Sequence, residues 1–140
     1  MKQVIRSKLA ECSKIVRQIR AESLARGYDE NDCFAVHLAL DEALSNAIRH
    51  GNDGDESKRI TIDCSIGDDA IRLSISDQGH GFDHRRVPDP TQEQNLRRAH
   101  GRGLFLMKAY MDQVYFNNEG NCVILVKWKG SAQAARKAAS

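Results

Sequence analysis

The sequence has little of what marks zinc-binding, secreted or membrane-spanning proteins. None of its four cysteines belongs to a C-x-x-C pair, and no histidine stands at zinc-ligand spacing from Cys12, Cys33, Cys64 or Cys122. No apolar run approaches the roughly 18 residues that a membrane helix needs, and none follows the N-terminus as in a signal peptide. We therefore expect a cytoplasmic protein whose cysteines are reduced and serve as small buried hydrophobic residues.

A large charge of either sign is also missing. The 21 basic and 19 acidic residues leave a formal net charge of +2, whereas dedicated nucleic-acid binders usually carry a strongly basic stripe. Direct binding of nucleic acid is therefore not expected. The 140 residues, of which 41% are hydrophobic and 29% charged, fit one globular domain that can bury a core without disulfides.

The apolar pattern predicts helices in the first half of the chain. Between residues 9 and 26, apolar residues recur mostly at helical spacing, which predicts a first helix. They are Leu9, Cys12, Ile15, Val16, Ile19 and Leu24. A second helix, capped by Asp29 or Asn31 and ended by Gly51, is expected to bury Val36, Leu40, Ala43, Leu44, Ala47 and Ile48. A third helix is expected from about 103 to 112, with a core side of Leu104, Met107 and Met111.

Strands are expected mainly in the second half. Residues 60–66 and 71–76 alternate apolar and polar side chains, which predicts a hairpin with one buried face. Further strands are expected at 2–6, near 113–118 and at 121–128. Helices followed by a largely antiparallel sheet predict an α+β fold over residues 1–130. Residues 83–100 are expected to form a long surface loop, and 131–140 a frayed tail.

Three polar motifs carry the chemistry. Glu42, Asn46 and Arg49 share a stripe of the second helix, where residues four apart lie only about 5–6 Å from each other at Cβ. An Asn carbonyl oxygen suits Mg²⁺, and a neighbouring Glu can deprotonate a hydroxyl. The stripe alone also fits an ordinary solvent-exposed helix face.

The other two motifs are glycine-containing turns. Asp77-Gln78-Gly79-His80-Gly81-Phe82 follows the 71–76 strand, so its acid can accept the amino group of adenine and its glycines allow close approach. Gly101-Arg102-Gly103-Leu104 comes where the third helix is expected to begin, and free N–H groups there suit phosphate. Plain turn and helix-start roles remain open for each motif alone. The sequence contains no P-loop or dinucleotide-binding motif.

Together, the three motifs resemble the GHKL superfamily, and within it the anti-sigma-factor serine/threonine kinases of bacterial partner switching. The likeness covers roughly residues 2–128 and is carried by the helix around Glu42-x-x-x-Asn46, by Asp77-x-Gly79-x-Gly81, and by Gly101-x-Gly103 with the residues that follow. It implies a two-layer α/β sandwich of the GHKL (Bergerat) type, with a mixed, mostly antiparallel sheet and helices on one face.

The resemblance also implies roles for particular residues. Glu42 would be the catalytic base and Asn46 the Mg²⁺ ligand, and residues 83–100 would form the lid over ATP. ATP would be bound by Asn46, Arg49, Asp77, Gly79, Gly81, Phe82, Gly101, Arg102, Gly103 and Leu104. Arg97, Arg98 and Arg102 are all candidates for a lid arginine near the γ-phosphate.

The expected function is phosphorylation of a small anti-sigma-factor antagonist by a homodimeric kinase that also binds a sigma factor. An alternative is a nucleotide-regulated binding module of the same fold without kinase activity. A detached histidine-kinase catalytic domain lacks room for a phosphoacceptor hairpin before residue 29, and a gyrase-like role lacks a transducer domain.

Overall fold

The computed structural model describes residues 1–79 and 99–130, without the side chains of 99–102. Within these ranges the elements are β1 (Lys2–Arg6), α1 (Leu9–Ala25), α2 (Glu30–Asn46), η1 (Ala47–Gly51, one π-helical turn), β2 (Arg59–Ile66), β3 (Ala70–Ser76), α4 (Ala99–Tyr110), β4 (Gln113–Phe116) and β5 (Cys122–Trp128). The predicted lid residues 83–98 and the predicted tail 131–140 lie outside the described residues.

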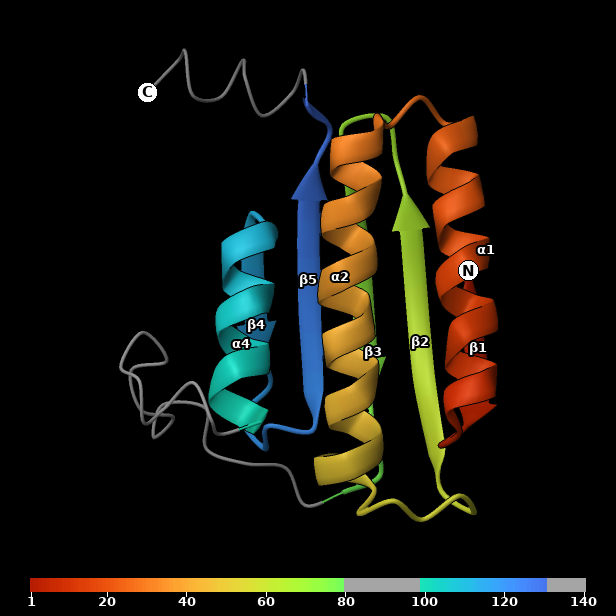
Figure 1. Cartoon of the computed structure of the whole chain (residues 1–140), viewed down its shortest axis with the longest axis vertical. Helices are drawn as coiled ribbons and strands as arrows, with labels where there is room; N and C mark the ends of the chain where they lie inside the picture. The colour runs from red at the N-terminus through yellow and green to blue at the C-terminus, as the bar shows by residue number, and fades with distance from the viewer. Residues whose placement is uncertain (80–98, 131–140) are drawn as a thin grey trace.

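The strands form one five-stranded sheet in the order β1-β2-β3-β5-β4. All four pairings among the described strands are antiparallel, so this sheet is not the mixed one expected. Figure 1 shows α1, α2 and α4 on one face of the sheet, with α2 over its middle. The predicted two-layer α+β fold with helices on one face is confirmed.

The core lies between the sheet and α2. The six apolar residues predicted for the second helix are all buried, and they meet the inward-facing side chains of the central strands, which include Ile60, Ile62, Ile71, Leu73 and Leu125. Side chains that alternate along a strand reach the same layer at every second residue. The periodic patterns therefore correctly predicted the core between α2 and the central strands.

Helix α1 differs from the prediction at both of its ends. The predicted apolar positions in its middle, Cys12, Ile15, Val16 and Ile19, are buried as expected. At its ends, however, Leu9 is 68% exposed and Leu24 is 39% exposed. Leu9 is the first residue of the helix. At the other end Ser23, four residues after Ile19, takes the buried position and donates its hydroxyl to the Ile19 carbonyl at 2.7 Å. Leu24 is turned away from the core because its spacing from Ile19 is five.

Helix α2 begins at a cap and ends in a wider turn than expected. Of the two predicted caps, Asp29 serves, since its carboxylate accepts the N–H of Asp32 at 2.7 Å. The chain continues from Asn46 into η1 and then bends, with left-handed backbone at Asp53 (φ 51°) and Gly54 (φ 71°). The helical segment ends at Gly51, as predicted, although the backbone of Gly51 has no positive φ.

Helix α4 begins earlier than expected. It runs from Ala99 to Tyr110, whereas the sequence predicted a start near 103 and an end near 112. Gly101 and Gly103 consequently lie inside the helix. The predicted core side is confirmed, because Leu104, Met107 and Met111 are all buried. The helix packs against α2, which places Gly103 beside the end of α2.

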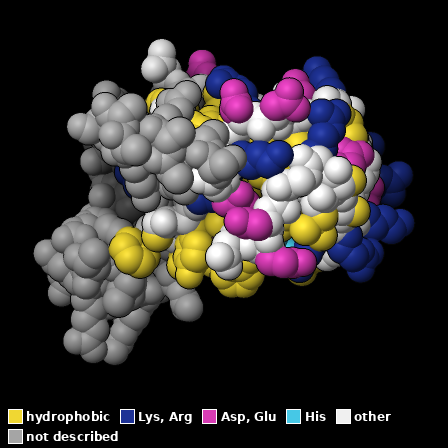
Figure 2. All heavy atoms as spheres, turned by 90° about the horizontal axis from the view of Figure 1, so that it is seen from above, with side chains coloured by type: hydrophobic (Ala, Val, Ile, Leu, Met, Phe, Trp, Pro, Cys, Tyr) yellow, Lys and Arg dark blue, Asp and Glu magenta, His cyan; other side chains and the backbone are white. Residues whose placement is uncertain are grey.

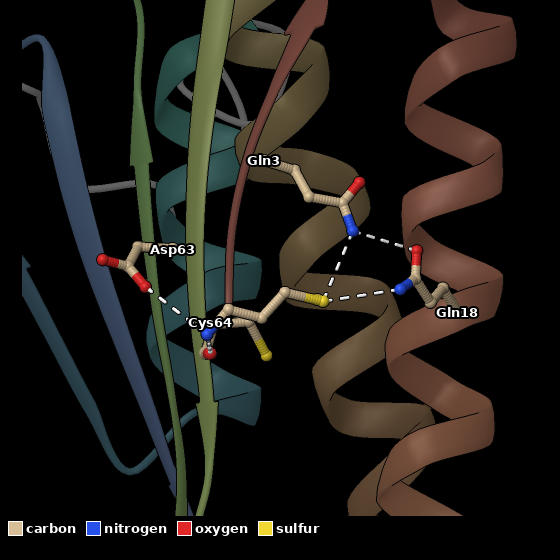
Figure 3. A network of polar contacts seen from close by, with 5 residues as sticks. Gln3, Gln18, Asp63 and Cys64 are labelled. Atoms are coloured by element: carbon tan, nitrogen blue, oxygen red, sulfur yellow. Dashed lines mark hydrogen bonds and ion pairs between the residues drawn. The ribbon is translucent and has the colours of Figure 1, made fainter.

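The first residues of the chain are tied to β2 and α1. The Met1 amino group donates to the Cys64 carbonyl at 2.7 Å and lies 4.0 Å from the Asp63 carboxylate. Figure 3 shows Gln3 of β1 and Gln18 of α1 pointing toward each other, with their amide groups 3.1 Å apart. Both amides also contact the Met1 sulfur. This network fixes the edge strand β1 against its neighbours.

Figure 2 views the molecule from the end at which α2 begins. Acidic and basic side chains both lie on this face, and basic side chains gather at its right edge in this view. In the part of the chain that the structure describes, no helix is both long and apolar enough to span a membrane.

Candidate functional site

Glu42 and Asn46 converge on one point of α4. Both side chains are half-buried and lie beside Gly103. A Cβ added at Gly103 would stand 2.9 Å from the Asn46 Nδ2 atom and 3.1 Å from the Glu42 Oε2 atom. The i, i+4 spacing therefore does bring a carboxylate and a carboxamide together, and the glycine lets α4 pack closely against both of them.

The turn after β3 packs on the end of η1. The Asp77 carboxyl group lies directly against Gly51, where an added Cβ would overlap its atoms. A Cβ at Gly79 would likewise overlap the Gly51 carbonyl. Two backbone segments can approach this closely only where both lack side chains. Gly51 therefore ends the helical segment, as predicted, and also leaves room for the Asp77 carboxyl group.

Asn46, Gly51 and Asp77 border a pocket of about 60 Å³ between α2, α4 and the sheet. Its apolar walls include Ile75, Leu104, Met107, Phe116 and Val123. Its polar lining includes Asn46, His50, Asp77, Asn121 and Cys122. Flat apolar walls with a few converging polar groups are typical of small-molecule sites.

The predicted site residues do not all reach this pocket. Asn46, Asp77 and Leu104 line it, and Glu42 and Gly103 lie beside Asn46. Arg49 is exposed on η1 and is not among the lining residues. Gly81 and Phe82, with the candidate arginines Arg97 and Arg98, lie outside the described residues. Gly101 and Arg102 are described only as backbone of α4.

Burial shifts the titration of two pocket groups. The pKa of Asp77 is raised by desolvation, although the Gly79 N–H, which donates to its Oδ1 atom at 2.8 Å, and Lys58 oppose the shift. The pKa of His50 is lowered by burial and by Arg49, against Asp53. The lowered pKa favours the neutral imidazole of His50, and Asp77 is a poorly solvated acceptor that a ligand amino group could satisfy.

Sequence reasoning missed the residues that support this pocket. Asn52 is completely buried beneath the Asp77 turn, and Asn121 lies on its other side. The π-helical turn η1 was also missed, although such turns are frequent at functional sites. The only available signal was that Asn is common in turns, which does not reveal burial.

The donor set fits a nucleotide with magnesium. Mg²⁺ takes few protein ligands and prefers oxygen, which the Asn46 amide offers in the lining of the pocket. The apolar walls suit a purine, and the Asp77 carboxylate suits an amino group on its edge. Among the described residues, no cluster of three or more His, Cys, Asp or Glu side chains is placed to hold a metal.

Comparison with known families agrees with this geometry. The model of the histidine kinase-like ATPase domain matches residues 5–127. The chain belongs to this family. The match to the histidine kinase-like ATPase domain spans α1 through β5, so the pocket lies wholly within it.

Curated relatives of this ATPase domain include bacterial regulators. The chain is 31% identical over 106 residues to the serine-protein kinase RsbW of Oceanobacillus iheyensis, which covers 71% of this chain and 67% of that protein. It is 30% identical over 112 residues to the protein of the same name from Listeria monocytogenes, with 75% and 71% covered. It is 37% identical over 98 residues to the anti-sigma F factor of Clostridium perfringens, with 66% and 69% covered.

A solved structure shares the fold. The histidine kinase domain of the blue-light activated histidine kinase from Erythrobacter litoralis superposes with a TM-score of 0.54 at 16% identity. The match covers 89% of this chain and 62% of that one. At this identity the likeness concerns the ATPase fold alone.

Proposed function

We propose that this chain is an ATP-dependent serine/threonine kinase that acts as an anti-sigma factor in a partner-switching system. Its phosphoacceptor would be a small antagonist protein that competes with the sigma factor. The observation that carries the proposal is the convergence of Glu42 and Asn46 on Gly103, next to the pocket that Asn46 and Asp77 line. The names of the relatives, a serine-protein kinase and an anti-sigma factor, support the same function.

Each group has a role in this proposal. Asp77 accepts the amino group of adenine, and the Asn46 amide oxygen binds Mg²⁺. When bound, the ion neutralises charge on the phosphates of the substrate ATP. Glu42, one helical turn from Asn46, accepts the proton of the attacking serine or threonine hydroxyl. The apolar walls of the pocket exclude water from the adenine ring.

The phosphate-binding role of Gly101, Gly103 and the Leu104 N–H requires a change in α4. Only the first four N–H groups of a helix lack partners within the helix, and Leu104 is the sixth residue of α4. Its N–H becomes free only if the helix begins near Gly103. Residues 83–100 would then act as the lid within a single domain of residues 1–130.

The proposal extends to assembly and location. We expect a homodimer in the cytoplasm that binds proteins and not nucleic acid. The resemblance to dimeric anti-sigma kinases, the edge position of β1 in the sheet and the net charge of +2 support these expectations.

The kinase is tested with ATP labelled in its γ-phosphate and purified candidate antagonists. Wild type should transfer label to a serine or threonine. Glu42→Ala should lower the transfer rate by at least about 100-fold while ATP affinity stays within a few-fold, because the base acts only in the chemical step. Asn46→Ala should lose magnesium-dependent ATP binding.

Asp41→Ala is the matched control, since Asp41 is the exposed neighbour of Glu42 on α2. It should leave transfer unchanged. ATP binding without transfer to any antagonist would instead support a nucleotide-regulated binding module without kinase activity.

A further inference from the structure

The Asp77 turn is held from beneath by one buried side chain. Asn52 has no exposed surface, and its Oδ1 atom accepts the N–H of Gln78 at 2.9 Å. Its Nδ2 group donates to the Arg59 carbonyl at 3.1 Å, where β2 begins. The carboxamide thus bridges the turn after β3 and the first residue of β2. Buried carboxamides with both ends bonded fix the segments that they join.

The backbone of Asn52 connects the same point to the other half of the site. Its N–H donates to the Ala47 carbonyl at 2.8 Å and closes the π-helical turn. Ala47 directly follows Asn46 in the chain. One residue therefore fixes the distance between the helix that carries Asn46 and the turn that carries Asp77.

The upper side of the turn is held by Asn121. Its carbonyl accepts the N–H of Asp77 at 2.9 Å, and its Nδ2 group donates to the Gly79 carbonyl at 3.3 Å. Asn117 in turn donates to the Asn121 side chain at 2.7 Å. Of the three turn residues, Gln78 depends on Asn52 for its N–H partner, and its own side chain accepts the Arg59 N–H at 2.6 Å.

We infer that Asn52 is a positioning residue for base recognition, which holds the Asp77 carboxylate where it meets the amino group of adenine. This inference rests on the proposed nucleotide site. Without the Asn52 carboxamide, the Gln78 N–H and the Arg59 carbonyl lose their buried partner, and the turn relaxes toward solvent. A displacement of about 1 Å is enough to weaken a directed hydrogen bond. Phosphate and magnesium contacts, made elsewhere, are untouched.

The test compares ATP with inosine triphosphate, which carries a carbonyl in place of the adenine amino group. Calorimetry in magnesium buffer should give wild type at least about a tenfold preference for ATP, because a hydrogen bond to a carboxylate is lost with inosine. Asn52→Ala should reduce this preference to within about threefold, mainly through weaker ATP binding. Its affinity for inosine triphosphate should change little.

If Asn52 had only a structural role, Asn52→Ala would weaken the binding of ATP and of inosine triphosphate to the same extent. Ile19→Val, which trims a buried side chain of α1 away from the turn, is the stability-matched control and should keep the full preference. Asn52→Ser is the replacement variant if Asn52→Ala does not fold. Its hydroxyl is one atom closer to the backbone and cannot bridge the Gln78 N–H and the Arg59 carbonyl. It should lose the preference as well.

An Asn52 variant that keeps the wild-type preference overturns the inference while the nucleotide site stands. A wild type that binds neither nucleotide, or binds both equally, refutes the proposed role of Asp77 itself. That result is visible before any Asn52 variant is measured.

Discussion

At the scale of single residues, Asp77 illustrates a conflict between stability and binding. Its carboxylate is partly desolvated against Gly51 and receives the N–H of Gly79. A carboxylate in water would be more fully hydrated, so burial raises its pKa. Binding sites commonly keep such destabilising groups because the ligand completes their hydrogen bonds.

Asp77→Asn should therefore raise the melting temperature of the nucleotide-free protein at neutral pH. Since the folded pKa is above the ordinary value of 3.8, the folded state holds the proton more tightly than the unfolded chain. Stability is lost as pH rises from that value through the folded pKa, and the loss persists above it. Thermal unfolding should show a gain for the variant near pH 7 that shrinks toward about pH 4. Equal melting temperatures at pH 7 would contradict this account.

Gly79→Ala should disrupt the same turn by crowding. The new Cβ overlaps the Gly51 carbonyl, and overpacking of this kind typically costs about 1–3 kcal/mol. We expect ATP affinity to fall at least tenfold together with the melting temperature. Gly67→Ala is the matched control, because its nearest neighbour, the Ala70 carbonyl oxygen, stands at 3.5 Å. Similar losses in both variants would refute a specific clash.

At the scale of elements, prediction from sequence succeeded where burial repeats along the chain. The apolar faces of α2, β2 and β3 were predicted because each repeat places many side chains in one layer. The start of α4 was not, since residues 99–102 add no apolar periodicity. The proximity of Glu42 and Asn46 was predicted correctly, because i, i+4 spacing brings their side chains together. Asn52 was not found, because its burial depends on where the ends of β2 and β3 meet.

The N-terminus of α2 offers a test of element stability. Asp29→Ala removes the acceptor for the Asp32 N–H and should cost about 1 kcal/mol, or a few degrees in melting temperature. Asn31→Ala is the control, because Asn31 is exposed within the helix and was the other candidate cap. ATP affinity should be unchanged in both, since the 17-residue helix separates the cap from Asn46 by about 25 Å. A larger loss for Asn31→Ala would reverse the assignment.

At the scale of the whole molecule, one end of the sandwich carries the pocket and the other end is stabilised by polar contacts. The end at η1 holds the pocket. The opposite end is closed by polar contacts, in which the Tyr28 hydroxyl donates to the Gly67 carbonyl at 2.7 Å and the Gly130 N–H donates to Asp32 at 2.9 Å. These contacts tie the chain segments around α2 together away from the site, so changes at the pocket need not disturb them.

The reactivity of the four cysteine thiols should reflect how deeply each is buried. Cys12, Cys33 and Cys64 are buried, which raises the pKa of each and lifts that of Cys12 and of Cys64 to about 11. Cys122 is only partly buried and lines the pocket. A chromogenic disulfide reagent should therefore titrate one thiol rapidly in the native protein and all four after denaturation.

ATP with magnesium should slow the fast reaction, and Cys122→Ser should abolish it. Rapid reaction of a second thiol, or no protection by ATP, would contradict the placement of Cys122 in the nucleotide pocket.

The pairing of the Asp77 N–H with the Asn121 carbonyl has a consequence for protein synthesis. A nascent chain that ends after β3 already contains Glu42, Asn46 and Asp77. It lacks β5, the second strand that pairs with β3. It also lacks Asn121, which holds the other side of the turn. Contacts between segments this distant in sequence form late, because closing the intervening chain costs entropy. Nucleotide binding should thus begin only when β5 leaves the ribosome, so that translation itself times the onset of activity.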